Sequence, residues 1–400
     1  MSRKQLEEMA SINRLHAKNG TIELANKIVQ IPASQYYDRT RWLTEIEEIF
    51  KRLPLVLGIS KELKKPGDYK ALEVVGMPVI INRNSQGKLN AFLNICQHKG
   101  AALVETGYGN SYHFRCPYHG WAYNDNGDLI GIPDNDNFGD LDKGCNGLIT
   151  LPIEERAGII WVTLDPKSEL SIDSFLSGYD KMLAHFKFED WYIFDTRTLK
   201  GPNWKVAYDG YLDLYHLPVL HQETFGTEIS NKAMFYAWGP HQRVISPARL
   251  SSQDDFEGTG MDYNELPIKE IPTEVLMTGV WTIFPHVSIA SFNGGGRSVL
   301  LSQLLPGENP EESYTVQYYL MEKEPNEKQR KEAQEQFKFL KHVVKEEDYA
   351  TGLKLQKGLK TGKMKSVLFG RNEGGGQVFH NWVNQLIKTK DKDLMNLFKK

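Results

Sequence analysis

Two short loops that each pair a cysteine with a histidine place the tightest constraint on how this chain folds. Cys96 and His98 form a C-x-H sequence, and Cys116 and His119 form C-x-x-H after seventeen intervening residues. Thiolate and imidazole are ligands for zinc and for iron–sulfur clusters, so we expect the two loops to meet at one metal centre. The runs around them are short, β-forming and separated by Gly, Asn, Asp and Pro, and residues 84–87 and 125–127 have the composition of hairpin turns. This pattern predicts a small antiparallel β domain over residues 51–165.

The composition of each loop favours a two-iron cluster over zinc. Two cysteines and two histidines can hold a tetrahedral zinc ion, but zinc fingers more often pair like with like within a ββα unit. Here each loop supplies one thiolate and one imidazole, which suits a [2Fe-2S] cluster with two thiolates on one iron and two imidazoles on the other. Neutral imidazoles raise the reduction potential of such a cluster, because the oxidised state loses the stabilisation of anionic ligands.

A second group of metal-ligand residues lies in the stretch DGYLDLYHLPVLH, residues 209–221. His216 and His221 stand five positions apart, so a straight α-helix would point their side chains about 140° away from one another. Pro218 lacks an N–H and clashes with the preceding turn, so we expect the helix to end or distort there and let the two imidazoles converge. Two neutral imidazoles suit a borderline metal such as iron.

The rest of the composition is ordinary for a soluble globular chain of two or three domains. A net charge of −3 gives no attraction to nucleic acid or to an anionic membrane. No run approaches eighteen apolar residues and the start lacks a signal-peptide core, so we predict neither a membrane span nor secretion. Three cysteines fit the reducing cytoplasm, with Cys145 as a plain thiol, and the Lys-rich end at residues 388–400 is predicted to be a solvated tail.

Local patterns predict helices towards both ends of the chain and a second β region between them. Residues 1–50 have helical spacing, the β-forming runs between 191 and 320 are expected to form one larger sheet, and residues 325–358 a long helix. The polar interval 246–272 is expected to be a surface loop that could cover a pocket, and the glycines at 374–376 to break the chain before a short final helix. The residues of the long helix that we expect to be buried are Phe337, Leu340, Val344 and Leu353.

Together these sequences resemble the α subunits of the Rieske non-haem iron oxygenases, the aromatic-ring-hydroxylating enzymes. HKGAALVETGYGN after the first loop and CPYHGWAYNDNGDL around the second resemble their Rieske domain, and DGYLDLYHLPVLH resembles their mononuclear iron motif. The final segment RNEGGGQVFHNWVNQL resembles the family's tail, so the likeness covers nearly the whole chain. It implies an α+β fold, in which a helical segment (1–50) packs on a helix-grip-like catalytic domain (166–400, an antiparallel sheet packed by helices) and a Rieske domain (51–165) lies between them in sequence.

The resemblance also implies a carboxylate ligand on a late helix, which would complete a site for mononuclear Fe(II) with His216 and His221. The matching segment is VKEEDYATGLKLQKGL, in which Asp348 is our choice. Glu347 and Glu346 remain alternatives, because spacing alone does not separate adjacent carboxylates.

Two acidic residues of the iron motif are assigned catalytic roles by the resemblance. Asp213 would not bind metal but would join His216 to His119 of the partner subunit by hydrogen bonds, and so carry electrons between cluster and iron. Asp209 matches a position that supports this network. Because the two metals of one chain are expected to be too far apart, the resemblance implies a homotrimer, alone (α3) or with a second type of subunit (α3β3).

The function implied is that of a terminal oxygenase that uses dioxygen to hydroxylate, once or twice, an apolar and aromatic substrate. The chain has neither a dinucleotide-binding fingerprint nor a four-cysteine cluster, so electrons from NAD(P)H need a separate reductase, with or without a ferredoxin. Alternatives are a monooxygenase that demethylates or acts on a non-aromatic substrate, a Rieske electron carrier and a zinc-stabilised interaction protein. The second motif disfavours the carrier, and a reddish-brown solution with a visible spectrum would exclude the zinc protein. The residues expected to line the substrate pocket are Leu214, Leu217, Leu220, Phe225, Trp281, Phe284, Ser291 and Asn293.

Overall fold

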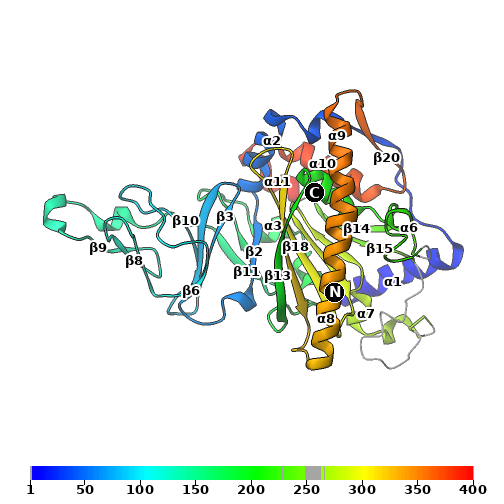
Figure 1. Cartoon of the computed structure of the whole chain (residues 1–400), viewed down its shortest axis with the longest axis horizontal. Helices are drawn as coiled ribbons and strands as arrows, with labels where there is room; N and C mark the ends of the chain where they lie inside the picture. The colour runs from blue at the N-terminus through cyan, green and yellow to red at the C-terminus, as the bar shows by residue number, and fades with distance from the viewer. Residues whose placement is uncertain (1, 227–228, 248–262, 265, 400) are drawn as a thin grey trace. The chain divides into compact units, whose positions relative to one another are not determined.

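The computed structural model describes residues 2–226, 229–247, 263–264 and 266–399 and divides the chain into two units (Figure 1). One unit is Phe50–Ile172; the other combines Met1–Ile49 with Asp173–Lys400. The boundaries thus lie at 49/50 and 172/173, where the sequence placed them at 50/51 and 165/166. The loop predicted over 246–272 falls largely outside the described residues. Among those described, no helix is long and apolar enough to cross a membrane.

The smaller unit is built from three antiparallel sheets, as the short β-forming runs predicted. Their strand orders are β10-β5-β4-β3-β6, β11-β12-β2 and β7-β8-β9. The strands are β2 (Leu55–Ile59), β3 (Asp68–Val74), β4 (Met77–Arg83), β5 (Leu89–Leu93), β6 (Gly107–Asn110), β7 (His113–Arg115), β8 (Ala122–Asn124), β9 (Leu129–Gly131), β10 (Thr150–Leu151), β11 (Ile153–Arg156) and β12 (Ile159–Val162). Short 3-10 turns lie at Ser60–Glu62, Asn135–Phe138 and Lys143–Asn146.

Two predicted hairpin turns hold the sheets of this unit together. Residues 84–87 connect β4 to β5 and residues 125–127 connect β8 to β9. The two turns bind each other, because Ser85 N–H donates to the Asp125 carboxylate at 2.6 Å and Asn84 Nδ2 donates to Asn126 Oδ1 at 2.8 Å. Through these two hydrogen bonds, the polar turn residues hold the sheet that contains β4 and β5 beside the sheet that contains β8 and β9.

The larger unit contains one seven-stranded antiparallel sheet, which confirms the expectation that the runs between 191 and 320 belong together. Its order is β13-β19-β18-β17-β16-β15-β14, so β14 to β19 follow one another in sequence order and β13 pairs with β19 at the far side. The strands are β13 (Tyr192–Gly201), β14 (Met234–Trp238), β15 (His241–Ile245), β16 (Val280–Ile283), β17 (Val287–Phe292), β18 (Ser298–Pro306) and β19 (Ser313–Met321). The segments β1 (Val29–Pro32) and β20 (Ser366–Phe369) form a separate pair.

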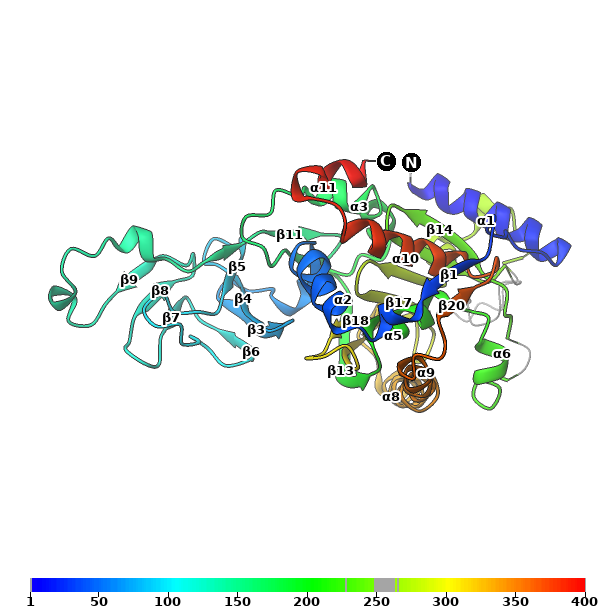
Figure 2. The ribbon, with the colours of Figure 1, turned by 90° about the horizontal axis from the view of Figure 1, so that it is seen from above.

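Helices cover this sheet, and the longest joins three segments end to end. They are α8 (Glu327–His342), the π-helix η8 (Val343–Tyr349) and α9 (Ala350–Lys360), seen as one rod in Figure 1 and along its axis in Figure 2. The helix α5 (Trp204–Leu212) packs against β16, β18, α9 and η8. The remaining elements of this unit are α1 (Ser2–Asn19), η1 (Ala33–Tyr36), α2 (Arg39–Glu45), η2 (Ile46–Lys51), α3 (Ile172–Leu176), α4 (Asp180–Leu183), α6 (Leu217–Leu220), η7 (Ile268–Glu270), α7 (Thr273–Leu276), α10 (Gly374–Leu386) and α11 (Asp391–Phe398).

One of the four residues of the long helix that we expected to be buried is exposed. Phe337, Leu340 and Val344 are buried, but Leu353 is 43% exposed, and Leu359 is buried in its place further along. The π-helix explains the change, because its i→i+5 turn holds more residues than an α turn and shifts the buried face of everything that follows.

Two predictions for the end of the chain were wrong. The glycines at 374–376 do not break the chain but begin α10, where they allow close packing: a Cβ on Gly375 would lie 2.5 Å from the ring of Phe235. The Lys-rich terminus is not a solvated tail throughout, since α11 buries Leu394, Leu397 and Phe398. Glycine and lysine patterns indicate only the local tendency of a segment. In α10 and α11, tertiary packing determined the structure instead.

Candidate cluster and metal sites

The two cysteine–histidine loops of the smaller unit have the same backbone hydrogen-bond pattern. In each loop the cysteine N–H donates to the carbonyl five residues later, and a glycine N–H four residues later donates back to the cysteine carbonyl. The four bonds are Cys96 N to Ala101 O (2.9 Å), Gly100 N to Cys96 O (2.9 Å), Cys116 N to Trp121 O (2.8 Å) and Gly120 N to Cys116 O (3.0 Å). Both glycines have positive φ, at 79° and 74°, which a residue with a Cβ adopts only with strain.

The four side chains of these loops are buried or half-buried, and both histidines have an unpartnered ring nitrogen. Cys96 and Cys116 are free thiols, 1% and 3% exposed, in the core of the domain. The half-buried rings of His98 and His119 have centroids 4.6 Å apart. The Nδ1 atoms of both histidines are buried without a hydrogen-bond partner, which is unfavourable unless a metal occupies that position. Trp121 stacks on His98 with centroids 5.0 Å apart and holds its ring.

The spread of these four side chains favours a cluster over a single zinc ion. Ligand atoms around a tetrahedral zinc lie roughly 3.3–3.8 Å apart, given bond lengths of about 2.0–2.3 Å. Of the His, Cys, Asp and Glu side chains in the described ranges, only one set of three has ligand atoms all within 4.8 Å of one another, and it lies in the larger unit. A two-iron cluster, whose ligands belong to two metals, accommodates the wider spacing.

In the larger unit, the predicted interruption of the iron-motif helix occurs earlier than expected. The helix α5 ends at Leu212, and Asp213 already has an extended backbone, with φ −110° and ψ 111°. The carboxylate of Asp213 accepts the N–H of Tyr215 at 2.5 Å, a local turn that competes with helical hydrogen bonding. Pro218 therefore does not break the helix; it lies in the first turn of α6, where its missing N–H costs nothing.

The break brings three side chains to one point. The Asp348 Oδ1 atom lies 3.6 Å from His216 Nε2 and 3.2 Å from His221 Nε2, and these are the three side chains whose ligand atoms lie within 4.8 Å. His216 and His221 come from the segment around α6, and Asp348 from η8. Two imidazoles and one carboxylate are the ligand set of a non-haem iron centre.

The other edge of each imidazole meets a second carboxylate. His216 Nδ1 lies 3.3 Å from Asp213 Oδ2, and His221 Nδ1 lies 2.6 Å from Glu347 Oε2. Burial lowers the pKa of His221, but the carboxylates of Asp348 and Glu347 outweigh this effect, so the net pKa is raised. The site thus favours positive charge, as a cation site should.

The alternatives for the third ligand differ in geometry. Glu347 reaches His221 through Nδ1 rather than the Nε2 edge where Asp348 lies, and Glu346 is exposed and pairs with Lys345 at 2.7 Å. This arrangement favours Asp348.

Asp209 contacts neither imidazole of the iron motif in the described hydrogen bonds and ion pairs. Its carboxylate accepts from the Tyr36 hydroxyl at 2.8 Å and from His380 Nε2 at 2.9 Å. Burial and then Asp209 raise the pKa of Tyr36. The adjacent turn of α5 is tied to the same N-terminal segment by the fully buried ion pair of Lys205 and Glu45. This network could not be predicted from the sequence, where its one signal is His380 in the apolar stretch VFHNWV.

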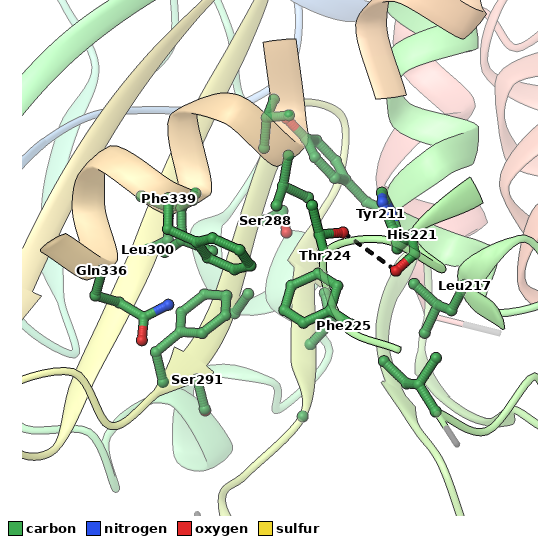
Figure 3. Close-up of a pocket in the computed structure, with 18 of the residues that line it drawn as sticks. Tyr211, Leu217, His221, Thr224, Phe225, Ser288, Ser291, Leu300, Gln336 and Phe339 are labelled. Carbon is green, nitrogen blue, oxygen red and sulfur yellow. Dashed lines mark hydrogen bonds between the residues drawn. The ribbon is translucent and has the colours of Figure 1, made fainter. Parts of the chain in front are cut away.

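A cavity of about 1130 Å³ opens beside the three converging side chains (Figure 3). Its floor is formed by strands β16 to β18, its walls by the segment 210–225 and by α8. Of the expected pocket residues, Leu214, Leu217, Phe225, Ser291 and Asn293 line it.

Three pocket predictions were wrong. Leu220 is not among the described lining residues, and Trp281 and Phe284 are fully buried in the core. Successive strand residues face opposite sides of a sheet, and in β16 it is Val280 that faces the cavity, which turns Trp281 away.

Phe225 forms an aromatic wall within the cavity. Its ring stands edge-on to His221, with centroids 5.6 Å apart, and edge-on to Phe339 of α8 at 5.3 Å (Figure 3). One ring therefore joins the candidate metal ligand to the opposite wall and gives the cavity an aromatic surface between them.

Two family models match the chain. The model described as Rieske [2Fe-2S] domain matches residues 54–152, and the model described as Ring hydroxylating alpha subunit (catalytic domain) matches residues 188–389. Each falls within one of the two units.

Relatives of several activities are similar in sequence. The large subunit of anthranilate 1,2-dioxygenase from Acinetobacter baylyi is 25% identical over 255 residues, covering 61% of this chain and 54% of that protein. The carnitine monooxygenase oxygenase subunit of Escherichia coli is 30% identical over 195 residues, covering 48% and 52%. The benzene 1,2-dioxygenase α subunit of Pseudomonas putida is 30% identical over 190 residues, covering 45% and 42%. The chain spans about half the length of these curated relatives.

Solved structures share the fold. The quaternary ammonium Rieske monooxygenase CntA in complex with L-carnitine superimposes with a TM-score of 0.74 at 21% identity, covering 89% of this chain and 95% of that one. Naphthalene 1,2-dioxygenase from Rhodococcus bound to indole gives a TM-score of 0.69 at 20% identity, covering 97% and 99%. The expected α+β fold, with a Rieske domain and a catalytic domain, is confirmed.

Proposed function

The chain belongs to the family of ring-hydroxylating oxygenase alpha subunits, and from this premise we propose that it is the terminal oxygenase of a multicomponent system. Electrons from NAD(P)H reach it through a separate reductase, with or without a ferredoxin. The observation that carries the proposal is the convergence of His216, His221 and Asp348 beside a cavity, in a chain that also has a Rieske domain. A reducing cytoplasmic setting belongs to the same proposal, because the cluster cysteines have to remain thiolates.

The proposed cofactors are a [2Fe-2S] cluster on Cys96, His98, Cys116 and His119 and a mononuclear Fe(II) on His216, His221 and Asp348. When bound, the cluster supplies single electrons and the iron activates dioxygen. The chain's own residues would hold both groups, and Asp213 and Glu347 would orient the imidazoles of His216 and His221. Three protein ligands would leave coordination positions of the iron for dioxygen, and the cavity beside them offers space for a substrate.

We further propose that the substrate is uncharged, apolar and aromatic. The described residues that line the cavity include no Lys or Arg but do include the acidic Asp213, Asp348, Glu332 and Glu335. A substrate carboxylate would therefore find no lysine or arginine partner among these lining residues. Phe225 offers a ring for edge-on contact with an aromatic substrate. An alternative is oxidative demethylation of an amine, since an acidic, aromatic-lined cavity also suits a cation.

Asp213 supports a proposal about assembly. Its side chain is 30% exposed while one oxygen lies 3.3 Å from His216 Nδ1, so the carboxylate has room for a further partner. The His119 ring in the cluster loop is also partly exposed. We propose that Asp213 binds His119 of the partner subunit in a homotrimer, α3 or α3β3, and that electrons pass through this bridge.

A product screen tests the function. The iron-loaded protein is combined with a surrogate reductase, NADH and matched pairs of compounds such as naphthalene and naphthoate, or N,N-dimethylaniline and aniline. The proposal expects hydroxylated product from the neutral aromatic compounds and little from the carboxylate. Release of formaldehyde from the N-methyl compound without ring hydroxylation would favour the demethylase. No substrate-dependent oxygen uptake with any compound, in protein that carries both metals, would contradict the proposed function.

A further inference from the structure

Two adjacent carboxylates of η8 approach opposite edges of one imidazole. Asp348 Oδ1 lies 3.2 Å from Nε2 of His221, and Glu347 Oε2 lies 2.6 Å from Nδ1 of the same ring. His221 is 2% exposed and Glu347 14% exposed, so the second contact is sheltered from solvent. Such a short, sheltered contact to an ionised group is stronger than an ordinary neutral hydrogen bond.

The chemistry of the two groups decides which atom carries the proton. The Glu347 oxygen is positioned to accept a ring N–H, so this contact favours a hydrogen on Nδ1 of His221. A neutral imidazole with its proton on Nδ1 has its lone pair on Nε2, the atom that faces Asp348 and the proposed iron. Glu347 therefore selects the tautomer that can bind metal.

The backbone of η8 explains how neighbours in sequence reach the same ring. On an α-helix consecutive side chains diverge by about 100°. Val343–Tyr349 is a π-helix, whose i→i+5 turn holds more residues, so consecutive side chains diverge by less. Glu347 and Asp348 can then both face His221.

A second contact fixes the Glu347 carboxylate. Thr224 Oγ1 donates to Glu347 Oε2 at 3.0 Å, and Thr224 N–H donates to the carbonyl of His221 at 3.1 Å. His216 has a comparable arrangement, in which Asp213 occupies its Nδ1 edge. Glu346 differs in every respect, because it is exposed and pairs with Lys345.

We infer that Glu347 is not an iron ligand but the positioning residue that fixes the ring orientation and tautomer of His221. The inference rests on the proposed metal site. It predicts that loss of the carboxylate weakens metal binding without removing the site, because all three ligand atoms remain.

Metal affinity tests this directly, with Glu346 as a matched control on the same helix. Fe(II) affinity is measured anaerobically by chelator competition in protein with an intact Rieske spectrum, for Glu347→Ala, Glu347→Gln, Glu346→Ala, Asp348→Ala and His216→Ala. Glu347→Ala should bind Fe(II) about 10–100-fold more weakly, yet reach the wild-type stoichiometry at saturation. Glu347→Gln retains a side-chain oxygen that accepts from Nδ1 and should recover most of the affinity, a rescue that a merely structural role would not require. Glu346→Ala should stay within about twofold of the wild type.

Two results would overturn the inference. Equal affinities for Glu347→Ala and Glu346→Ala would show that the contact has no positioning role. Failure of Glu347→Ala to bind Fe(II) even at saturation, with Asp348→Ala still binding, would make Glu347 the ligand. The proposed metal site is judged separately, since it fails only if His216→Ala keeps the ion.

Discussion

The two metal-binding regions of this chain are assembled in contrasting ways. The cluster ligands lie in two loops of one small domain, and each loop closes on itself through the same pair of backbone hydrogen bonds. The mononuclear site joins the segment after α5 to η8, so that His221 and Glu347 meet although they stand 126 positions apart in sequence. A site built from local loops can be recognised from spacing, whereas a site built by tertiary packing needs the fold. If this contrast is right, each site should be removable without the other.

The largest expected effect is that of His221→Ala. The change should remove the mononuclear iron and lower product formation by about a thousandfold or more, since metal stabilisation of the transition state amounts to several kcal/mol. The Rieske absorption should be unaffected, because the cluster loops lie in a separate unit. Iron analysis and the visible spectrum check both points. Simultaneous loss of the cluster would show that the two sites are not independent.

The converse change is Cys116→Ser. It should abolish the cluster, because a cluster thiolate is lost from a buried position, and turnover should cease for lack of electrons. Fe(II) binding to the other unit should persist. The exposed Cys145 provides the control, since Cys145→Ser should keep the cluster and the iron. Retention of full cluster absorption in Cys116→Ser would contradict the ligand assignment.

Asp213→Ala tests whether the two independent sites cooperate. At saturating Fe(II) both metals should be bound, since Asp213 ligates neither, while turnover should fall by at least about 10–100-fold. A pre-reduced cluster should fail to reoxidise when substrate and dioxygen are added. Normal reoxidation in this variant, or a fully active monomer, would show that no bridge between subunits exists.

A smaller effect is expected from Asp209→Asn. Asp209 accepts from Tyr36 and His380, so the amide should leave one buried donor without a good acceptor and lower the free energy of unfolding by about 1–3 kcal/mol. Thermal unfolding measures this change, and both metals should be retained. A loss of iron without a change in stability would give Asp209 a role at the metal instead.

Much of the fold could be predicted because its signals are local. The β runs, the two hairpin turns and the strands of the large sheet follow from alternation and turn residues. Leu353 could not be placed correctly, since the π-helix that shifts the buried face is invisible in a helical pattern. The predictions of a chain break at the C-terminal glycines and of a solvated Lys-rich tail failed because the packing of α10 and α11 overrode the local tendencies of these residues.

In the candidate sites too, features with a local signal in the sequence could be predicted and features set by tertiary packing could not. The convergence of His216 and His221 could be expected from their spacing, but its cause could not: Asp213 ends the helix, and Pro218 does not. Spacing also could not decide between Asp348 and Glu347 as the third metal ligand, because both are carboxylates at neighbouring positions. Only tertiary contacts distinguish the Nε2 edge of His221 from its Nδ1 edge.

The central claim, that one chain holds a cluster and an independent mononuclear iron, is tested most directly by counting metal and sulfide. Protein purified anaerobically should contain about three iron atoms and two acid-labile sulfides per chain, two of the irons in the cluster. The His221→Ala variant should contain about two iron atoms and two sulfides. Zinc without labile sulfide, or an unchanged iron count in His221→Ala, would contradict the account.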